Sequence, residues 1–278
     1  MDIGKNSFPF ENTLSEVKLA AAAALVAGRA INKIYRGDFS VSQKEDGSPV
    51  SEADIASNKI ICEILASSGC PILSEENADD KSRLAAKRVW IIDPLDGTAD
   101  FIKRIGDFTV MIGLVENHSP IAGVIYQPAG DILYAAQKDQ GAYFYQSGNW
   151  KKLASGDESE LTRARAVMSR NHLSEKEEMF LKKLNLNDSI RLGSCLKVIA
   201  VAKGQADLYF TFTDKIKQWD TCASYILLKE AGGKMTDMLG NDIGYNTETV
   251  NHQNGILAAN SSIHDKVVEE YKNFCHNR

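Results

Sequence analysis

The distribution of apolar and polar residues over the first quarter of the chain predicts two helices. From about residue 12 to residue 35, charged side chains interrupt a segment rich in Ala and Leu, and Asn12 or Thr13 is the expected N-cap. A second helix is expected from about residue 52 to residue 67, with Ser51 as its N-cap. Its predicted apolar face consists of Ile55, Ile60, Ile61, Ile64 and Leu65.

The pattern then changes to short runs that are typical of strands. Residues 89–92 form a buried-type strand that ends at Asp93. Further runs, separated by turn signals, follow at residues 108–115, 122–126, 132–137 and 142–145. Such close spacing favours an antiparallel meander. We therefore expect the first half to contain two helices packed on a mostly antiparallel sheet.

A polar stretch rich in Gly and Ser, residues 146–162, is the best candidate for a domain junction. After it, helices and strands alternate, which is typical of an α/β unit. The expected strands are 164–169, 207–212 and 256–259, and the expected helices are 175–184, 196–203, 219–231 and 263–274. We therefore predict an N-terminal α+β domain, residues 1–150, and a C-terminal α/β domain, residues 151–278. The pattern gives no assignment for the polar region 237–254.

Composition narrows the class of protein. With 278 residues, 44% hydrophobic and 25% charged, the chain is neither disordered, collagen-like nor a disulfide-stapled mini-protein. A net charge of −5 argues against non-specific binding of a nucleic-acid polymer, but not against a small anionic substrate. Five cysteines without a C-x-x-C pair indicate reduced thiols. The longest apolar run, residues 19–27, is shorter than the about 20 residues of a membrane span. We expect a cytoplasmic protein without a transmembrane segment; peripheral membrane association and a homodimer stay open.

The segment WIIDPLDGTADF, residues 90–101, carries the most informative chemistry. Asp96 follows Asp93 by three residues, so one turn can direct both carboxylates and the Leu95 carbonyl at one point. Gly97 permits an unusual backbone angle, and Thr98 would begin a short helix whose free N–H groups attract phosphate. Carboxylates and a carbonyl are hard oxygen donors that favour Mg²⁺ or Mn²⁺. The structural alternative is a D-P-x-D-G turn that only caps a helix.

Other acidic and glycine motifs have ordinary structural explanations when each is considered alone. Glu75 and Glu76 could belong to a solvated loop, Asp54 could complement a helix dipole, and Asp220 after Trp219 could cap a helix. The pair Gly232 and Gly233 could simply end a helix. Together and in this order, however, the motifs match D…EE…DP(I/L)DGT…WD…GG. This pattern resembles that of the inositol monophosphatase superfamily of Mg²⁺-dependent, lithium-sensitive phosphatases, and the resemblance covers about residues 12 to 260. It implies a layered αβαβα sandwich.

The resemblance also implies a set of metal ligands. One Mg²⁺ would be held by Glu75, Asp93 and the Leu95 carbonyl. A second would be held by Asp93, Asp96 and Asp220, with Asp93 bridging the two ions, and a third ion stays open. Glu76 is expected outside this ligand set.

The catalytic roles that the resemblance implies concern the attacking water and the phosphate. A water near Glu75 would attack phosphorus in line. Thr98, with Asp54 behind it, would orient this water and help to deprotonate it. The backbone N–H groups of Gly97 and Thr98 would hold phosphate oxygens. Positioning and charge neutralisation would then supply most of the catalysis.

Three local segments bear on the substrate, because they resemble those of the 3′(2′),5′-bisphosphate nucleotidases of the CysQ type. GSCLK, residues 193–197, is similar to their GSSLK, in which the first Ser and the Lys face substrate phosphates; Cys195 departs from it. FIKRIGDFTV, residues 101–110, resembles their FIKRNGEFTV, and Asp100 stands where inositol enzymes have Asn. SRNH, residues 169–172, resembles their SRSH, with Asn171 in place of Ser and an open role for His172.

These segments supply candidates for a second, distal phosphate, which needs cationic or hydroxyl partners away from the metals. The full expected substrate-binding set is Glu75, Leu95, Asp96, Gly97, Thr98, Arg170, Ser194, Lys197 and Asp220. We therefore expect hydrolysis of adenosine 3′,5′-bisphosphate (PAP) to AMP and phosphate, with PAPS as a second substrate, which would clear a by-product of sulfate assimilation. The alternatives are an inositol or sugar-phosphate phosphatase and, more remotely, a non-catalytic binding protein on the same fold.

Overall fold

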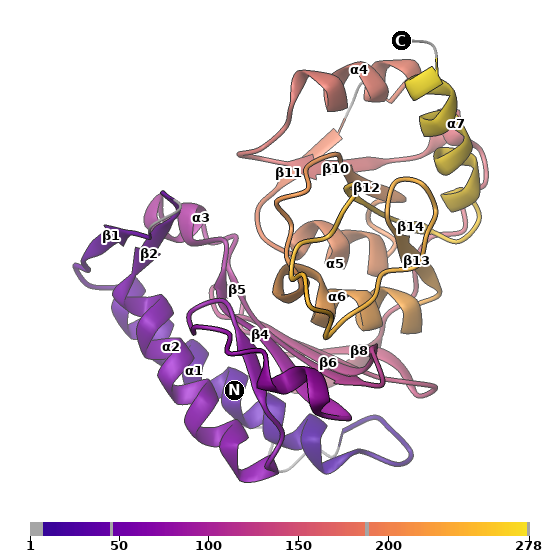
Figure 1. Cartoon of the computed structure of the whole chain (residues 1–278). Coiled ribbons are helices and arrows are strands. Elements are labelled where there is room, and N and C mark those ends of the chain that lie inside the picture. The colour runs from indigo at the N-terminus through magenta and orange to yellow at the C-terminus, as the bar shows by residue number, and fades with distance from the viewer. Residues whose placement is uncertain (1–7, 45–46, 187–188, 277–278) are drawn as a thin grey trace.

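The computed structural model describes residues 8–44, 47–186 and 189–276. Its helices and sheets form the five alternating layers that the resemblance implied (Figure 1). The helices are α1 (Ser15–Tyr35), α2 (Glu52–Leu65), α3 (Thr98–Ile102), α4 (Glu175–Lys183), α5 (Leu196–Ala202), α6 (Gln218–Glu230) and α7 (His264–His276). Short 3-10 turns cover Ala66–Ser68, Ser82–Ala85 and Leu161–Arg163. No described helix combines the length and apolar character that crossing a bilayer requires.

The first sheet has seven strands in the order β3-β4-β5-β6-β7-β8-β9. They are β3 (Ile72–Ser74), β4 (Arg88–Asp96), β5 (Thr109–Glu116), β6 (Ser119–Gln127), β7 (Ile132–Gln137), β8 (Gly141–Gln146) and β9 (Asn149–Lys152). Every neighbouring pair is antiparallel except β3 with β4, which is parallel. The predicted meander is therefore confirmed, and β3 and β9 extend it at its two edges.

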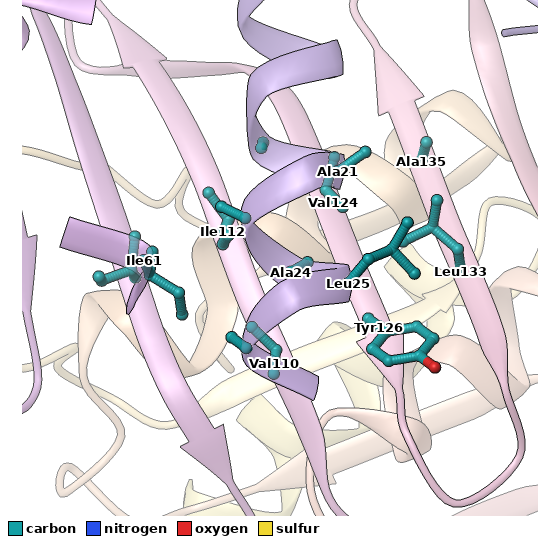
Figure 2. Packing of buried hydrophobic residues seen from close by; sticks show 14 of the residues in the cluster. Ala21, Ala24, Leu25, Ile61, Val110, Ile112, Val124, Tyr126, Leu133 and Ala135 are labelled. Atoms are coloured by element: carbon teal, nitrogen blue, oxygen red, sulfur yellow. The ribbon is translucent and has the colours of Figure 1, made fainter. Parts of the chain in front are cut away.

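Helices α1 and α2 cover one face of this sheet, as the sequence predicts. Figure 2 shows Ala21, Ala24 and Leu25 of α1 lying over the side chains of β5, β6 and β7. Small alanine side chains let the helix backbone approach the sheet closely, so that Val110, Ile112 and Val124 are fully buried or nearly so. The apolar face of α2 is confirmed at Ile61 and Leu65, but the prediction for Ile55 is wrong, since it is 56% exposed.

The middle layer, α5 and α6, packs between the two sheets. Gly113 of β5 and Gly123 of β6 face each other across the strand ladder. A Cβ atom at Gly113 would lie 2.4 Å from the Cys222 sulfur, and one at Gly123 would lie 2.6 Å from the Ala223 carbonyl oxygen. This glycine pair therefore forms a flat platform on which α6 rests against the sheet without intervening side chains.

The second sheet has five strands in the order β11-β10-β12-β14-β13. They are β11 (Ser189–Leu192), β10 (Ala166–Ser169), β12 (Leu208–Thr211), β14 (Ile256–Asn260) and β13 (Gly233–Thr236). The sheet is mixed, because β10 pairs in parallel with β11 and β12 whereas β14 is antiparallel to both of its neighbours. Helices α4 and α7 cover its outer face through a cluster of aromatic rings around Phe180. A two-stranded hairpin, β1 (Val41–Gln43) and β2 (Pro49–Ser51), precedes α2.

Two local predictions are corrected by the structure. The N-cap of α1 is Leu14 rather than Asn12 or Thr13, and no side chain caps this helix. Instead, the Leu14 N–H donates to the Gln137 side chain of β7 at 2.8 Å, so the sheet supplies the acceptor. The polar stretch 146–162 contains strand β9, whose Trp150 packs on Tyr145 of β8. The division into two domains near residue 150 stays a prediction.

Candidate active site

Two parallel strands bring Glu75 and Asp93 to the same end of the first sheet. Ser74 of β3 lies opposite Ile92 of β4, and the next residue of each strand is the acid. The Glu75 N–H donates to the Ile92 carbonyl at 3.3 Å, which continues the pairing to the site. The carboxyl ends of parallel strands meet at one edge of a sheet, which is why two acids 18 residues apart in the sequence become neighbours.

The first turn of α6 brings the third acid to this edge. The Lys217 N–H donates to Asp220 Oδ2 at 2.7 Å, so that the carboxylate caps the helix as well as facing the site. Carboxylate oxygens of Glu75, Asp93 and Asp220 all lie within 4.8 Å of one another. The structure therefore assembles three of the four predicted acidic ligands from three separate parts of the chain.

The fourth predicted ligand, Asp96, occupies the turn that follows a register shift between β4 and β5. Its Oδ2 accepts a hydrogen bond of 2.5 Å from the Cys195 N–H, and it is not part of the three-acid group among the described residues. Gly97 has a φ of 95°, which a side chain would strain, and a Cβ there would lie 2.5 Å from the Asp107 carbonyl oxygen. This glycine therefore allows the turn to close.

Burial raises the pKa values of Asp93, Asp96 and Asp220. Burial is the largest cause in each case, followed by the charges of the neighbouring carboxylates: the pKa of Asp220 rises to about 8, and that of Asp93 lies well above its usual value. The pKa of Asp96 rises to about 6, with the Lys197 charge opposing the rise. Several anions held close together in a buried place bind a cation favourably. The donors brought together are carboxylate oxygens, which fit Mg²⁺ or Mn²⁺, and the predicted Leu95 carbonyl accepts from the Thr98 hydroxyl at 3.2 Å.

Lys44 provides a positive charge beside these acids, and the sequence analysis did not identify it. It follows β1, and its Nζ lies 2.7 Å from Glu75 Oε1 and 2.6 Å from Glu76 Oε1. Burial lowers the pKa of Lys44, but the two carboxylates outweigh burial and raise it. Glu76 thus lies beside the ligand set as predicted, paired with a lysine.

Helix α2 supports residues 93–98, called the metal-ligand turn from here on, through two hydrogen bonds. The Thr98 hydroxyl donates to Asp54 Oδ1 at 2.9 Å, and the Ser57 hydroxyl donates to the Pro94 carbonyl at 2.7 Å. Asp54 also completes a capping box with Ser51, the predicted N-cap of α2, because its Oδ2 accepts from the Ser51 N–H and hydroxyl at 2.8 and 2.6 Å. Burial raises the pKa of Asp54, whereas these hydrogen bonds lower it. The structure therefore brings the predicted pair Thr98 and Asp54 into contact.

The unassigned region 237–254 packs behind Asp220. The neutral ring of His252 is 7% exposed, and its Nε2 lies 2.7 Å from the Thr221 hydroxyl. Tyr245 donates its hydroxyl proton to the same Thr221 oxygen at 3.0 Å. Burial lowers the pKa of His252 to about 4. These side chains fix the first turn of α6, and no periodic sequence pattern predicts their positions.

The predicted distal-phosphate residues lie on the other side of the metal-ligand turn. Ser194 packs over Gly97, with its Cβ 3.1 Å from the place where a glycine Cβ would stand. Lys197 opens α5, and its Nζ donates to the Ser194 carbonyl at 2.5 Å and lies 5.3 Å from the centre of the Tyr209 ring. Burial lowers the pKa of Lys197, and the Asp96 charge opposes this. Ser194 and Lys197 are thus adjacent to the predicted metal site.

Arg170 is held by an acid that the sequence analysis did not assign. Its Nη2 lies 2.5 Å from Asp107 Oδ2 and donates to the Arg191 carbonyl at 3.1 Å. Asp107 also accepts from the Gly193 N–H at 2.9 Å, so it joins the two predicted substrate segments. His172 is exposed, and its backbone N–H donates to the Ser169 hydroxyl. Asp107 precedes β5 of the first sheet and Arg170 follows β10 of the second, so their contact depends on how the two sheets are arranged, which sequence spacing does not reveal.

Comparisons with known proteins identify the family of this chain and several of its relatives. The sequence pattern of the Inositol monophosphatase family matches residues 13–274. The 3′(2′),5′-bisphosphate nucleotidase CysQ of Escherichia coli K12 is 36% identical over 224 residues, which cover 79% of this chain and 89% of that protein. The crystal structure of CysQ from Bacteroides thetaiotaomicron, a bacterial member of the inositol monophosphatase family, has a TM-score of 0.76 at 32% identity and covers 88% of this chain and 97% of that one.

A third similar protein is named for a different activity. The structure of inositol monophosphatase from Anabaena (Nostoc) sp. PCC 7120 has a TM-score of 0.75 at 30% identity, covering 93% of this chain and 96% of that chain. Similarity of the fold therefore does not separate the two substrate classes. The resemblance inferred from the sequence motifs is confirmed: this chain belongs to the inositol monophosphatase family.

Proposed function

We propose that this chain hydrolyses the 3′-phosphate of PAP to give AMP and phosphate, with PAPS as a second substrate. The observation that carries the proposal is the contact between the GSCLK turn and the metal-ligand turn, through the Cys195 N–H and Asp96 Oδ2. This contact places a hydroxyl and an ammonium group, Ser194 and Lys197, next to the acidic cluster. A substrate with two phosphates can then use the acids and their cation at one end and Lys197 at the other.

Mg²⁺ is the proposed cofactor, two ions or three, held by carboxylates and one carbonyl. The residues that would hold it are Glu75, Asp93, Leu95, Asp96 and Asp220. When bound, Mg²⁺ would neutralise charge on the phosphoryl group and make water a better nucleophile at neutral pH. The raised pKa values of Asp93, Asp96 and Asp220 support this assignment, because burial and the neighbouring carboxylates outweigh the opposing charges of Lys197 and Lys217.

Thr98 and Asp54 are proposed to handle the proton of the attacking water. The Thr98 hydroxyl donates to Asp54 Oδ1, which leaves its oxygen lone pairs free to accept a hydrogen bond from water. As the water attacks, its proton passes to Thr98 Oγ1 while the Thr98 proton moves to Asp54. Burial raises the pKa of Asp54, which makes that carboxylate a better proton acceptor.

The distal phosphate is proposed to contact Lys197 and Arg170. Asp107 holds the Arg170 guanidinium in place, while Lys197 is partly buried over Tyr209. Such cations gain most from a phosphate, since charge-assisted hydrogen bonds are stronger than neutral ones. PAP is a by-product of sulfate assimilation, so hydrolysis of PAP would give this chain a role in that process. The five cysteines, all free thiols in the structure, support a cytoplasmic location.

The test measures phosphate release with and without Mg²⁺ from PAP, from 3′-AMP, which lacks the 5′-phosphate, and from inositol 1-phosphate. We expect Mg²⁺-dependent release with kcat/KM highest for PAP. A preference for inositol 1-phosphate would favour the inositol-phosphatase alternative, which the similarity to the Anabaena protein supports. Absence of phosphate release from all three compounds, with binding intact, would favour a non-catalytic binding protein.

A further inference from the structure

Two of the substitutions that distinguish this chain from related motifs lie in direct contact. Asp100, in α3, accepts a hydrogen bond at its Oδ1 from Asn171 Nδ2 at 2.8 Å. Lys103, which follows α3, donates from its Nζ to Asn171 Oδ1 at 3.0 Å. The Asn171 amide is therefore held at both of its polar atoms by the α3 region. A serine at position 171 would have a shorter side chain with a single hydroxyl, whereas Asn171 reaches Asp100 and Lys103 through two separate atoms.

The other carboxylate oxygen of Asp100 lies against the segment that carries Lys197. Asp100 is 1% exposed, and its Oδ2 is buried without a hydrogen-bond partner among the described residues. A Cβ atom at Gly193 would stand only 1.7 Å from this oxygen and 2.9 Å from Asp100 Cγ. Glycine at 193 thus lets the carboxylate lie directly against the backbone. An unpaired buried oxygen costs stability, so the surrounding packing must hold it there.

Asp100 therefore touches both of the proposed distal-phosphate segments. Asn171 is the neighbour of Arg170, and Gly193 is the neighbour of Ser194 in the turn that leads to Lys197. Through α3, Asp100 is also linked rigidly to Gly97 and the metal-ligand turn, since the Asp100 N–H donates to the Gly97 carbonyl at 2.9 Å. Burial lowers the pKa of Lys197, and the Asp100 charge is among those that oppose it.

We propose that Asp100 is a positioning residue that sets the separation between the metal site and the distal-phosphate residues, and thereby the preference for a bisphosphate over a monophosphate. It acts by bracing Asn171 on one side and the Gly193 turn on the other. The inference rests on the proposed function, because it concerns how the same site selects its substrate.

The experiment compares kcat and KM for PAP and 3′-AMP in wild type, Asp100→Ala, Asp100→Asn and a control, Asp157→Ala, at an exposed position. Asp100→Ala should lower kcat/KM for PAP by roughly tenfold, mainly through KM, because a small displacement of binding groups has large kinetic effects. The 3′-AMP reaction should change by less than about threefold.

Two control variants accompany Asp100→Ala. Asp100→Asn keeps an acceptor for Asn171 and should stay within about threefold of wild type on both substrates. Asp157→Ala should match wild type.

A second set of variants tests the contact with Gly193. Gly193→Ala should lower both thermal stability and the preference for PAP, because its Cβ collides with Asp100. Adding Asp100→Ala to Gly193→Ala should recover part of the lost stability, since it removes the colliding carboxylate. If Asp100→Ala does not fold, Asn171→Ala replaces it in the comparison and should lower the PAP preference in the same direction by a smaller factor.

Three results would overturn the inference. The PAP to 3′-AMP ratio of Asp100→Ala could equal that of wild type, which would show that Asp100 does not set the preference. Equal losses on both substrates would mean that Asp100 supports the metal site or the fold. Independent, additive stability losses for Gly193→Ala and Asp100→Ala would contradict the bracing contact. Failure of the proposed function is recognised separately, because wild type itself would then prefer 3′-AMP or inositol 1-phosphate.

Discussion

The two ends of the proposed site differ in how the fold builds them. We call one end the metal pole, which comprises Glu75, Asp93, Asp96 and Asp220. The other end is the distal pole, which comprises Arg170, Ser194 and Lys197. The metal pole consists of acids at the ends of β3 and β4 and at the start of α6, and burial with mutual repulsion raises the pKa of three of them. The distal pole consists of turn residues at the edge of the second sheet, and its two cations already have partners in Asp107 and the Ser194 carbonyl.

This difference separates chemistry from substrate choice. The metal pole needs an external cation to balance its negative charge, so few substitutions of its acids would preserve its function. The cations of the distal pole already have hydrogen-bond partners within the chain, so single substitutions there can alter what it binds without altering the reaction. Relatives with different named activities, such as the bisphosphate nucleotidase of Escherichia coli and the inositol monophosphatase of Anabaena, are the expected consequence.

The largest effect is expected when the metal pole loses its most buried charge. Asp93→Asn should lower kcat at saturating Mg²⁺ by at least about a hundredfold on every substrate, because electrostatic stabilisation of the transferring phosphoryl group is lost. Thermal unfolding in EDTA should show no loss of stability, since Asn can still accept from the Leu95 N–H and no longer repels its neighbours. More than a tenth of wild-type turnover would contradict a central role for Asp93.

A smaller and selective effect is expected at the distal pole. Lys197→Ala should lower kcat/KM for PAP by about 10- to 150-fold, because a hydrogen bond to a charged group contributes about 1.5–3 kcal/mol. Hydrolysis of 3′-AMP should change by less than about threefold. Lys197→Met is the matched control for packing, since it keeps an apolar stem over Tyr209 without the charge. Equal losses on both substrates would assign Lys197 to the metal pole or the fold.

Lithium should distinguish the poles without any mutation. Li⁺ is a small, hard cation that can compete for oxygen ligands at the metal pole, so millimolar LiCl should inhibit uncompetitively or non-competitively. The half-inhibitory concentration should be the same, within about twofold, for PAP and 3′-AMP, because both substrates use the same acids. Full activity in tens of millimolar LiCl would argue against this family property in this chain.

The smallest effect concerns the support behind the metal pole. His252 is held neutral in the fold with a pKa of about 4, against 6.5 in an unfolded chain, so folding loses stability as the pH falls from 6.5 towards 4. Between pH 7.5 and pH 5 the contribution is about 2 kcal/mol in the free energy of unfolding. Urea unfolding of wild type and His252→Gln at both pH values should show a smaller pH dependence in the variant. Equal pH dependence would show that His252 titrates normally.

The sequence predicted the elements with strong periodicity and the motifs with fixed local spacing. Helices α1 and α2, the meander from β4 to β8 and the turn around Gly97 agree with their predictions because short-range patterns determine them. The three-residue strand β3 and the strands β11 and β13 were missed, since their runs are too short for a period to show. The mixed direction of the second sheet was equally invisible, because strand pairing depends on distant partners.

Within the site, sequence motifs identified the acids but not their supports. Glu75, Asp93 and Asp220 were found because each stands in a recognisable motif and the order of the motifs is informative. Lys44, Asp107 and His252 were missed because each meets its partner only through tertiary packing. The turn signal at residues 44–47 and the acid before Phe108 could have drawn attention to two of them, yet neither pattern specifies a partner.

The platform formed by Gly113 and Gly123 has a consequence for how sequences in this family can evolve. These glycines are not among the proposed site residues, yet any side chain there would push α6, and Asp220 with it, away from the sheet. Natural selection on the reaction should therefore act on them about as strictly as on the acids. A lineage could exchange residues of the distal pole one at a time and acquire a new substrate, whereas a new side chain on the platform would have to be matched by changes at Cys222 and Ala223. The residues of the distal pole should consequently change rapidly during evolution, whereas those of the platform and the metal pole should hardly change.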